Sequence, residues 1–155
     1  MRILVVSDTH RDRASLFRAI MSQPTADVVI HLGDGADEAE EAKRDYPEKM
    51  FLLVRGNNDW GAALPSEGLA TFLGKHIFYT HGHLYNVKYG MYDVISAARS
   101  HKADVLLYGH THEPRTEYQD GLYIMNPGSL HGSCGTYGIL DITPAGIVTN
   151  IVAGN

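Results

Sequence analysis

Residues 3–34 read ILVVSDTHRDRASLFRAIMSQPTADVVIHLGD, and this stretch decides the fold. Two apolar runs rich in β-branched residues, 3–6 and 28–32, have the length of buried strands. Asp12 can cap a helix between them, and Pro24 follows the end of that helix. Four apolar residues repeat within it at a helical period: Leu16, Phe17, Ile20 and Met21. The pattern predicts a parallel β-α-β unit.

The same alternation continues along the chain. Three more apolar runs of strand length follow, at residues 51–54, 77–79 and 105–108, and helical patterns occupy residues 36–47 and 90–103. Parallel β-α-β units are therefore expected through the N-terminal two thirds. After Pro114, residues 116–126 and 135–153 each place turn residues between two apolar runs, which predicts two hairpins. We expect one domain, residues 1–155, of the α/β class with mixed sheets covered by helices.

Composition narrows the class of protein. The hydrophobic fraction is 44% and the charged fraction 20%, as in ordinary globular proteins. The single cysteine, Cys134, rules out an intramolecular disulfide and fits a reducing cytosol. The first apolar run is too short for a signal peptide or a membrane span, so a cytoplasmic protein without a membrane partner is expected. A formal net charge of -5 argues against a stable nucleic-acid complex.

Polar side chains follow each of the five apolar runs. In order these are Asp8 and His10, Asp34, the segment 57–59, His81 and His83, and His110 and His112. Each group alone could be an ordinary turn or a helix-capping loop. The carboxyl ends of parallel strands, however, meet at one edge of a sheet, where ligands bind. The recurrence therefore predicts one site built from all five strand ends.

Seven of these side chains carry donors for a divalent metal: Asp8, His10, Asp34, Asn57, His81, His110 and His112. Carboxylate, amide and imidazole ligands suit manganese, iron, zinc, cobalt or nickel. No cysteine is needed, which argues against a closed structural zinc site. Seven ligands are too many for one open catalytic metal. Two metals that share one carboxylate account for them.

The ordered motifs resemble those of the calcineurin-like metallophosphoesterases, and most closely the small YfcE-type phosphodiesterases. The matching order is Asp-x-His, Gly-Asp, Gly-Asn-x-Asp, His-Gly-His and Gly-His-x-His, followed by Asn126-Pro127-Gly128-Ser129. This resemblance implies a four-layer α-β-β-α sandwich with two mixed β-sheets. It also implies three groups of ligands for two divalent ions: Asp8, His10 and His112 for the first, Asn57, His81 and His110 for the second, and Asp34 as the bridge. Manganese is the expected metal, with nickel, zinc, iron and cobalt left open.

The resemblance further implies the activity. A dinuclear centre would hydrolyse a small phosphodiester or a nucleotide-like substrate by in-line attack of a metal-bridging hydroxide. Two alternatives stay open. One is a phosphomonoesterase or phosphatase, and the other is a protein-binding scaffold without catalysis, like the retromer small subunit, which has this fold. Association into a homo-oligomer is also left open.

One position departs from the pattern of larger relatives, which carry a histidine near the leaving group. Here that residue is Asn58, which can donate a hydrogen bond but cannot act as an acid near neutral pH. His83 is the candidate substitute, with a solvated or supporting role as the alternative. Arg11 could bind a substrate phosphate or be a solvated residue at the helix start.

Other side chains are given packing or surface roles. Trp60 with Leu64 could form a lid, a packing contact or an interface patch. Three tyrosines at helical spacing are expected to pack, or to form an aromatic wall facing the substrate: Tyr85, Tyr89 and Tyr92. Three histidines are assigned no chemistry: His76, His101 and His131.

Overall fold

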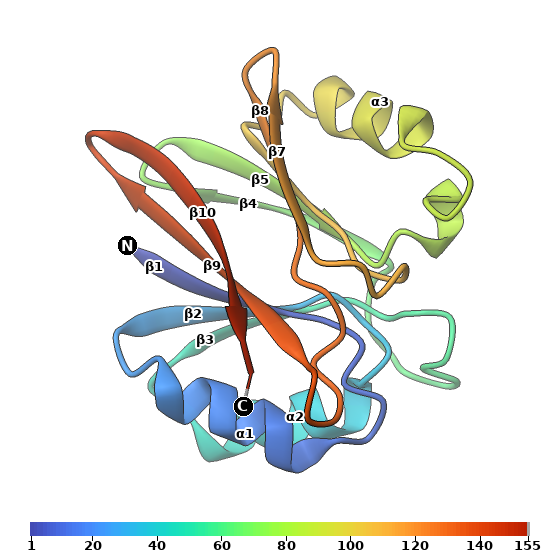
Figure 1. The fold of residues 1–155 in the computed structure, drawn as a ribbon, viewed down its shortest axis with the longest axis vertical. Helices are drawn as coiled ribbons and strands as arrows, with labels where there is room; N and C mark the ends of the chain where they lie inside the picture. The colour runs from blue at the N-terminus through green and yellow to red at the C-terminus, as the bar shows by residue number, and fades with distance from the viewer. Residues whose placement is uncertain (155) are drawn as a thin grey trace.

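The computed structural model describes residues 1–154, in which ten strands form two five-stranded sheets (Figure 1). The first sheet has the order β10-β9-β1-β2-β3. Its strands are β1 (Arg2–Val6), β2 (Ala26–His31), β3 (Met50–Leu53), β9 (Thr136–Thr143) and β10 (Gly146–Ala153). The second sheet has the order β4-β5-β6-β8-β7. Its strands are β4 (Glu67–Phe72), β5 (Lys75–Thr80), β6 (Val105–Leu107), β7 (Arg115–Gln119) and β8 (Leu122–Asn126).

Both sheets are mixed. In the first, β1 pairs in parallel with β2 and β2 with β3, whereas β9 runs antiparallel to β1 and β10. In the second, β6 lies parallel to both β5 and β8, and the two edge strands β4 and β7 are antiparallel to their neighbours. The C-terminal hairpins β7-β8 and β9-β10 lie where the sequence predicts them.

Helices cover the outer face of each sheet (Figure 1). Helices α1 (Arg13–Ser22) and α2 (Ala36–Asp45) lie on the first sheet, and α3 (Tyr92–Ser100) lies on the second, after the short 3-10 helix η1 (His83–Tyr85). The Asp12 side chain caps α1 as predicted, because its Oδ1 accepts a hydrogen bond of 3.0 Å from the Ser15 amide. No helix within residues 1–154 is long and apolar enough to cross a membrane.

Alternation along β1 shows how the layers are held together. Ile3 and Val5 point into the apolar core between the two sheets, while Leu4 and Val6 point outward against α1 and α2. The inner core joins both sheets, with members such as Ile30, Ile77, Val105, Leu107 and Leu140. A third core forms between the second sheet and α3 from residues such as Phe78, Leu106, Ile124, Val94 and Ala98. The predicted four-layer α-β-β-α sandwich is thus confirmed.

Two local predictions are wrong. Parallel units do not run without interruption through the N-terminal two thirds, because β4 and β5 form an antiparallel hairpin that starts the second sheet. Strand β4 is an edge strand with no fully buried residue, so its apolar pattern is weak. Met21, expected on the inner stripe of α1, is 64% exposed, because the helix buries Leu16 and Ile20 on a different face.

The β4-β5 turn generates a stability prediction. Leu73 lies in this turn with φ 51°, a left-handed conformation that a leucine adopts at a cost of about 1–2 kcal/mol. Asparagine tolerates this conformation, and Asn-Gly is the preferred sequence of such turns. Because Leu73 is 63% exposed, Leu73→Asn loses little packing and should raise the melting temperature by about 2–4 °C.

The matched control for this prediction is Leu69→Asn, in the same hairpin and 48% exposed. Leu69 does not have a positive φ, so asparagine gains nothing there and loses strand propensity. Thermal unfolding followed by circular dichroism compares the two variants. Equal melting temperatures for both would contradict the account of the turn.

Candidate metal centre

The seven predicted ligand residues lie in the loops that follow β1, β2, β3, β5 and β6. These loops gather along one edge of the molecule, where the two sheets approach each other (Figure 1). The structure arranges six of the seven side chains in two groups, each with donor atoms within 4.8 Å of one another. The first group is Asp8, His10 and His112, and the second is Asp34, His81 and His110.

The first group joins the loops after β1 and β6. Nε2 of His112 lies 3.2 Å from Nε2 of His10 and 3.2 Å from Oδ1 of Asp8, and Nε2 of His10 lies 3.5 Å from the same oxygen. Oδ2 of Asp8 accepts hydrogen bonds from Ser7 and from the backbone of His110. The Asp8 carboxylate is thereby fixed with Oδ1 directed at the imidazoles.

The second group centres on the buried His81. Its Nε2 lies 3.4 Å from Oδ2 of Asp34, 3.2 Å from Nδ1 of His110 and 3.0 Å from Oδ1 of Asn57, the seventh predicted ligand. Nδ1 of His81 lies 2.7 Å from the Leu32 carbonyl. A carbonyl can only accept, so Nδ1 carries a proton, and Nε2 is the atom available to a cation.

The two groups are adjacent through their carboxylates. Oδ2 of Asp34 is 4.0 Å from Nε2 of His10, and Oδ1 of Asp8 is 3.9 Å from Nε2 of His81. Each carboxylate therefore lies within reach of both groups. The two cross-group distances are nearly equal, and the resemblance assigns the bridging role to Asp34.

The donor spacing fits a bound divalent metal. Two ligand atoms, each about 2.1 Å from one ion at octahedral or tetrahedral angles, lie about 3.0–3.4 Å apart. The nitrogen–nitrogen contacts of 3.2 Å in both groups match this spacing. In both groups, two imidazole nitrogens and a carboxylate oxygen converge on one point, an arrangement that a shared cation stabilises.

Backbone conformation also marks this cluster. Five of the seven residues have left-handed backbone: Asp8 (φ 54°), His10 (φ 45°), Asp34 (φ 58°), His110 (φ 72°) and His112 (φ 64°). Non-glycine residues rarely adopt this conformation, and each instance costs of order 1–3 kcal/mol. Such conformations persist only where surrounding contacts impose them. They concentrate at functional sites.

Asp59 accepts the hydrogen bonds that hold the Asp34 loop in its left-handed conformation. Its buried carboxylate accepts four backbone hydrogen bonds of 2.7–3.0 Å, from Gly56, Asp34, Gly35 and Ala36. A Cβ on Gly56 would lie 2.1 Å from Oδ1 of Asp34, so glycine is needed for this close approach. The sequence shows Asp59 in a turn motif, and nothing in it identifies these distant backbone partners.

A buried network fixes the loop after β1. Thr9 Oγ1 donates to Glu38 Oε2 at 2.8 Å, and Glu38 Oε2 also accepts from the Arg11 amide at 2.6 Å. His31 Nδ1 accepts from the Gly33 amide, so its Nε2–H donates to Thr9 at 3.0 Å. Burial lowers the pKa of His31, which keeps this ring neutral. Sequence reasoning missed this network because its members lie on three separate elements.

The charge state of the cluster favours a cation. Burial opposes ionisation of Asp34, but hydrogen bonds and charge from His81, with hydrogen bonds from Asn58, hold the pKa of Asp34 well below its usual range. Burial likewise opposes protonation of His81, yet Asp34 and Asp8 raise the pKa of His81. Burial and the neighbouring His81 lower the pKa of His110 to about 4. Without a metal, a proton on His81 therefore neutralises part of the negative charge of the two carboxylates. A bound metal cation can take the place of this proton.

The three tentative catalytic residues lie around this cluster. Asn58 donates to Asp34 twice, from its backbone to Oδ1 and from Nδ2 to Oδ2, both at 2.9 Å. His83 lies beside the second group, with its ring centroid 5.3 Å from that of His81, and its buried Nδ1 has no hydrogen-bond partner within residues 1–154. Burial, with the charge of His81, lowers the pKa of His83. Arg11 is exposed at the edge of the cluster.

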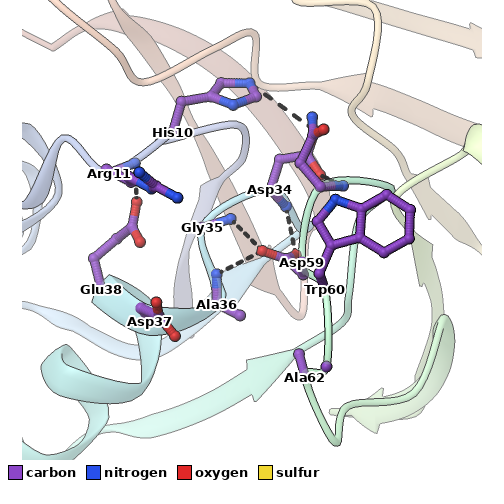
Figure 2. A pocket seen from close by; sticks show the side chains of 12 residues that line it. His10, Arg11, Asp34, Gly35, Ala36, Asp37, Glu38, Asp59, Trp60 and Ala62 are labelled. Atoms are coloured by element: carbon purple, nitrogen blue, oxygen red, sulfur yellow. Dashed lines mark hydrogen bonds and ion pairs between the residues drawn. The ribbon is translucent and has the colours of Figure 1, made fainter.

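An open cavity of about 450 Å³ adjoins the first group (Figure 2). Its lining includes His10, Arg11, Asp34, Asn58 and Trp60. Volumes of this size are common for small-molecule sites. Reactive donors and a space for a ligand therefore lie side by side.

The remaining aromatic and histidine side chains have separate positions. Tyr85 packs near Phe78 and donates to Glu67, and burial with this bond raises the pKa of Tyr85 to about 12. Tyr89 and Tyr92 are exposed and do not line the cavity. Leu64 packs against the first sheet's outer core, apart from the exposed Trp60.

Among the histidines assigned no chemistry, His76 contacts Thr71 and His101 stacks on Phe78. His131 lies nearer the site than expected, with its ring 6.3 Å from that of His10.

Comparison with known proteins identifies the family. Residues 1–144 match the calcineurin-like phosphoesterase superfamily domain. The chain is 35% identical to phosphodiesterase YfcE of Escherichia coli over an alignment of 168 residues, covering 91% of this chain and 88% of YfcE. It is 30% identical to vacuolar protein sorting-associated protein 29 of Schizosaccharomyces pombe over 138 residues, covering 86% of this chain and 74% of that protein.

A solved structure agrees with these sequence matches. The crystal structure of a predicted phosphoesterase from Streptococcus pneumoniae TIGR4 aligns with a TM-score of 0.82 at 26% identity, covering 99% of this chain and 89% of that chain. The chain belongs to the calcineurin-like phosphoesterase superfamily. This family is metal-dependent, in agreement with the two donor groups of the cluster.

The shared position of Asp34 generates a prediction about metal binding. Calorimetric titration with Mn²⁺ should show two ions per chain, and saturation should raise the melting temperature because the ions bind only the folded state. Asp34→Ala should weaken both binding events, since its carboxylate adjoins both groups. His112→Ala should mainly weaken one, since His112 belongs to the first group alone.

His76→Ala is the control, because His76 lies on the edge hairpin and contacts Thr71 instead of the cluster. Circular dichroism establishes that each variant is folded before titration. Two ions bound to Asp34→Ala with the affinity of the unsubstituted protein would show that this carboxylate is not shared.

Proposed function

We propose that this calcineurin-like phosphoesterase is a phosphodiesterase that hydrolyses a small phosphodiester or a nucleotide-like substrate. The observation that carries the proposal is the pair of adjacent donor groups beside an open cavity, with Asp34 of the second group 4.0 Å from His10 of the first. The name of the E. coli relative YfcE supports the same reaction class.

The proposed ligand sets follow the two groups. Asp8, His10 and His112 would hold one ion, Asn57, His81 and His110 the other, and Asp34 both. Two divalent cations, when bound, supply Lewis acidity that activates water and neutralises charge developing on the phosphate. Manganese is the proposed metal, and nickel, zinc, iron and cobalt suit the same nitrogen and oxygen donors.

Residues around the ions would position the substrate. The exposed Arg11 guanidinium would bind a phosphate oxygen pair, since its planar fork suits bidentate contacts. Asn58, held at Asp34, would offer a neutral hydrogen bond to the leaving oxygen or to the phosphate. His83, whose Nδ1 is unpartnered, is the alternative to Asn58 at the leaving group.

A scaffold without catalysis is the second candidate, because the S. pombe relative is named as a vacuolar protein sorting protein. The complete set of seven donors favours the enzyme, since a binding scaffold does not require strained metal-ligand loops. Cytoplasmic action on a small substrate, without a nucleic-acid or membrane complex, is part of the proposal. The net charge of -5 disfavours binding to nucleic acid.

The first test compares a diester with its monoester. With Mn²⁺ present, bis-p-nitrophenyl phosphate should be hydrolysed faster than p-nitrophenyl phosphate, and a chelator should stop the reaction. His112→Ala should lower diester turnover by about 100-fold or more, because even residues supporting metal ligands change activity by 10–100-fold. His76→Ala should have no effect.

The two other outcomes of this comparison each favour one of the alternative functions. Faster hydrolysis of the monoester would favour the phosphomonoesterase or phosphatase. No hydrolysis of either compound with manganese, nickel, zinc, iron or cobalt would favour the scaffold.

A second prediction concerns the leaving group. Without an acid at Asn58, rates over a series of aryl and alkyl diesters should depend steeply on leaving-group pKa. Asn58→His should narrow the difference in rate between aryl and alkyl diesters by about 10²-fold, the usual size of general-acid catalysis. His83→Ala should leave the dependence of the unsubstituted protein unchanged.

Two results would revise this assignment. A shallow dependence that becomes steep in His83→Ala would show that His83 supplies the proton. If both variants follow the unsubstituted protein across the series, neither side chain contacts the leaving group.

A further inference from the structure

Trp60 occupies an unusual position for the largest apolar side chain. It is the single tryptophan of the chain and is 86% exposed. Isolated exposed apolar residues are common on proteins and need no explanation by themselves. Trp60, however, lines the same cavity as His10 and Asp34 of the candidate metal centre. Its exposed ring therefore faces a space where a substrate can bind.

The exposure of Trp60 is built into the fold. Residues 59–62 form a turn closed by a 3.2 Å hydrogen bond from the Ala62 amide to the Asp59 carbonyl, with Gly61 at φ 75°. The Asp59 carboxylate in turn accepts the Asp34 amide at 2.8 Å. One residue thus anchors both the metal-ligand loop and the turn that displays Trp60.

Arg11 stands on the opposite wall of the cavity (Figure 2). Its backbone is left-handed at φ 70° and is held by the bond from its amide to Glu38. Its guanidinium forms no hydrogen bond or ion pair with other side chains in the described part of the chain, residues 1–154. The cavity therefore presents an available cation across from an available aromatic face.

The acidic residues of the cavity restrict what can bind between them. The carboxylates of Glu38 and Asp59 are occupied by hydrogen bonds from Thr9, Arg11 and backbone amides. Asp37 also lines the cavity, and its carboxylate disfavours a second phosphate there. The lining therefore suits a ligand with one anionic end and one neutral, planar end.

We propose that this cavity is a nucleobase subsite, in which Trp60 stacks on the base of a nucleoside phosphodiester while Arg11 contacts its phosphate. This inference rests on the proposed phosphodiesterase function and names its substrate class. Every base has a π-face, so stacking on tryptophan recognises nucleobases without selecting one sequence. The volume of about 450 Å³ is within the range of small-ligand sites.

Binding can be tested without turnover, because Trp60 is the only tryptophan and its fluorescence reports on the cavity. Protein loaded with Zn²⁺, which is diamagnetic, is titrated with AMP or with ribose 5-phosphate, which lacks the base. AMP should quench the emission saturably and bind about ten-fold more tightly than ribose 5-phosphate, as expected from stacking. Equal affinities, or no fluorescence change with AMP, would overturn the proposal.

Variants separate the two contacts, with calorimetry replacing fluorescence where the tryptophan is removed. Trp60→Leu should weaken AMP binding about ten-fold and leave ribose 5-phosphate unchanged, and Trp60→Phe should retain most of the affinity. Arg11→Gln should weaken both ligands equally. Tyr89→Leu is the control, because Tyr89 is 91% exposed but does not line the cavity. Unchanged AMP affinity in Trp60→Leu would exclude stacking.

The inference and the proposed function can fail separately. If AMP is preferred over ribose 5-phosphate but no diester is hydrolysed, the base subsite stands and the phosphodiesterase proposal falls. If aryl diesters are hydrolysed and AMP has no advantage, the enzyme stands and the base subsite falls.

Discussion

The candidate site depends on the carboxylate of Asp59. Four backbone amides from two different loops converge on it, and they hold Asp34 in a left-handed conformation beside His81. Hydrogen bonds to a buried carboxylate are stronger than those between neutral groups, so one side chain can offset the cost of the strained loop. The same residue begins the turn that carries Trp60. The placement of Asp34, the conformation of its loop and one wall of the cavity therefore depend on a single anchor.

Much of the fold was predictable because its signals are local. Strand-length apolar runs, the Asp12 cap and the turns of the two C-terminal hairpins each depend on neighbouring residues, and all are found in the structure. Strand β4 was missed because an edge strand has no fully buried residue to mark it. The ligand residues could be proposed from their place after strands. Their supports could not, because Glu38 acts on Thr9 and Arg11 from another element, and Asp59 acts on backbone amides that have no sequence signature.

Fold alone does not decide between an enzyme and a binding scaffold, since relatives of both kinds match this chain. The arrangement of the donors bears on the choice. Imidazole nitrogens meet at 3.2 Å in both groups, and the Leu32 carbonyl accepts from Nδ1 of His81, which leaves Nε2 available to a cation. Strained backbone at five of these residues has a cost in stability that a ligand-binding role explains. The adjoining cavity, with Arg11 and Trp60 available, provides room for a substrate beside the donors.

The central claim is that two metal ions bind at this cluster and share Asp34. Anomalous diffraction from a crystal of the protein grown with Mn²⁺ tests it most directly. The account predicts two peaks about 3.5–4 Å apart, one among Asp8, His10 and His112 and the other among Asn57, His81 and His110, with Asp34 contacting both. A single peak, or two peaks of which only one contacts Asp34, would contradict it.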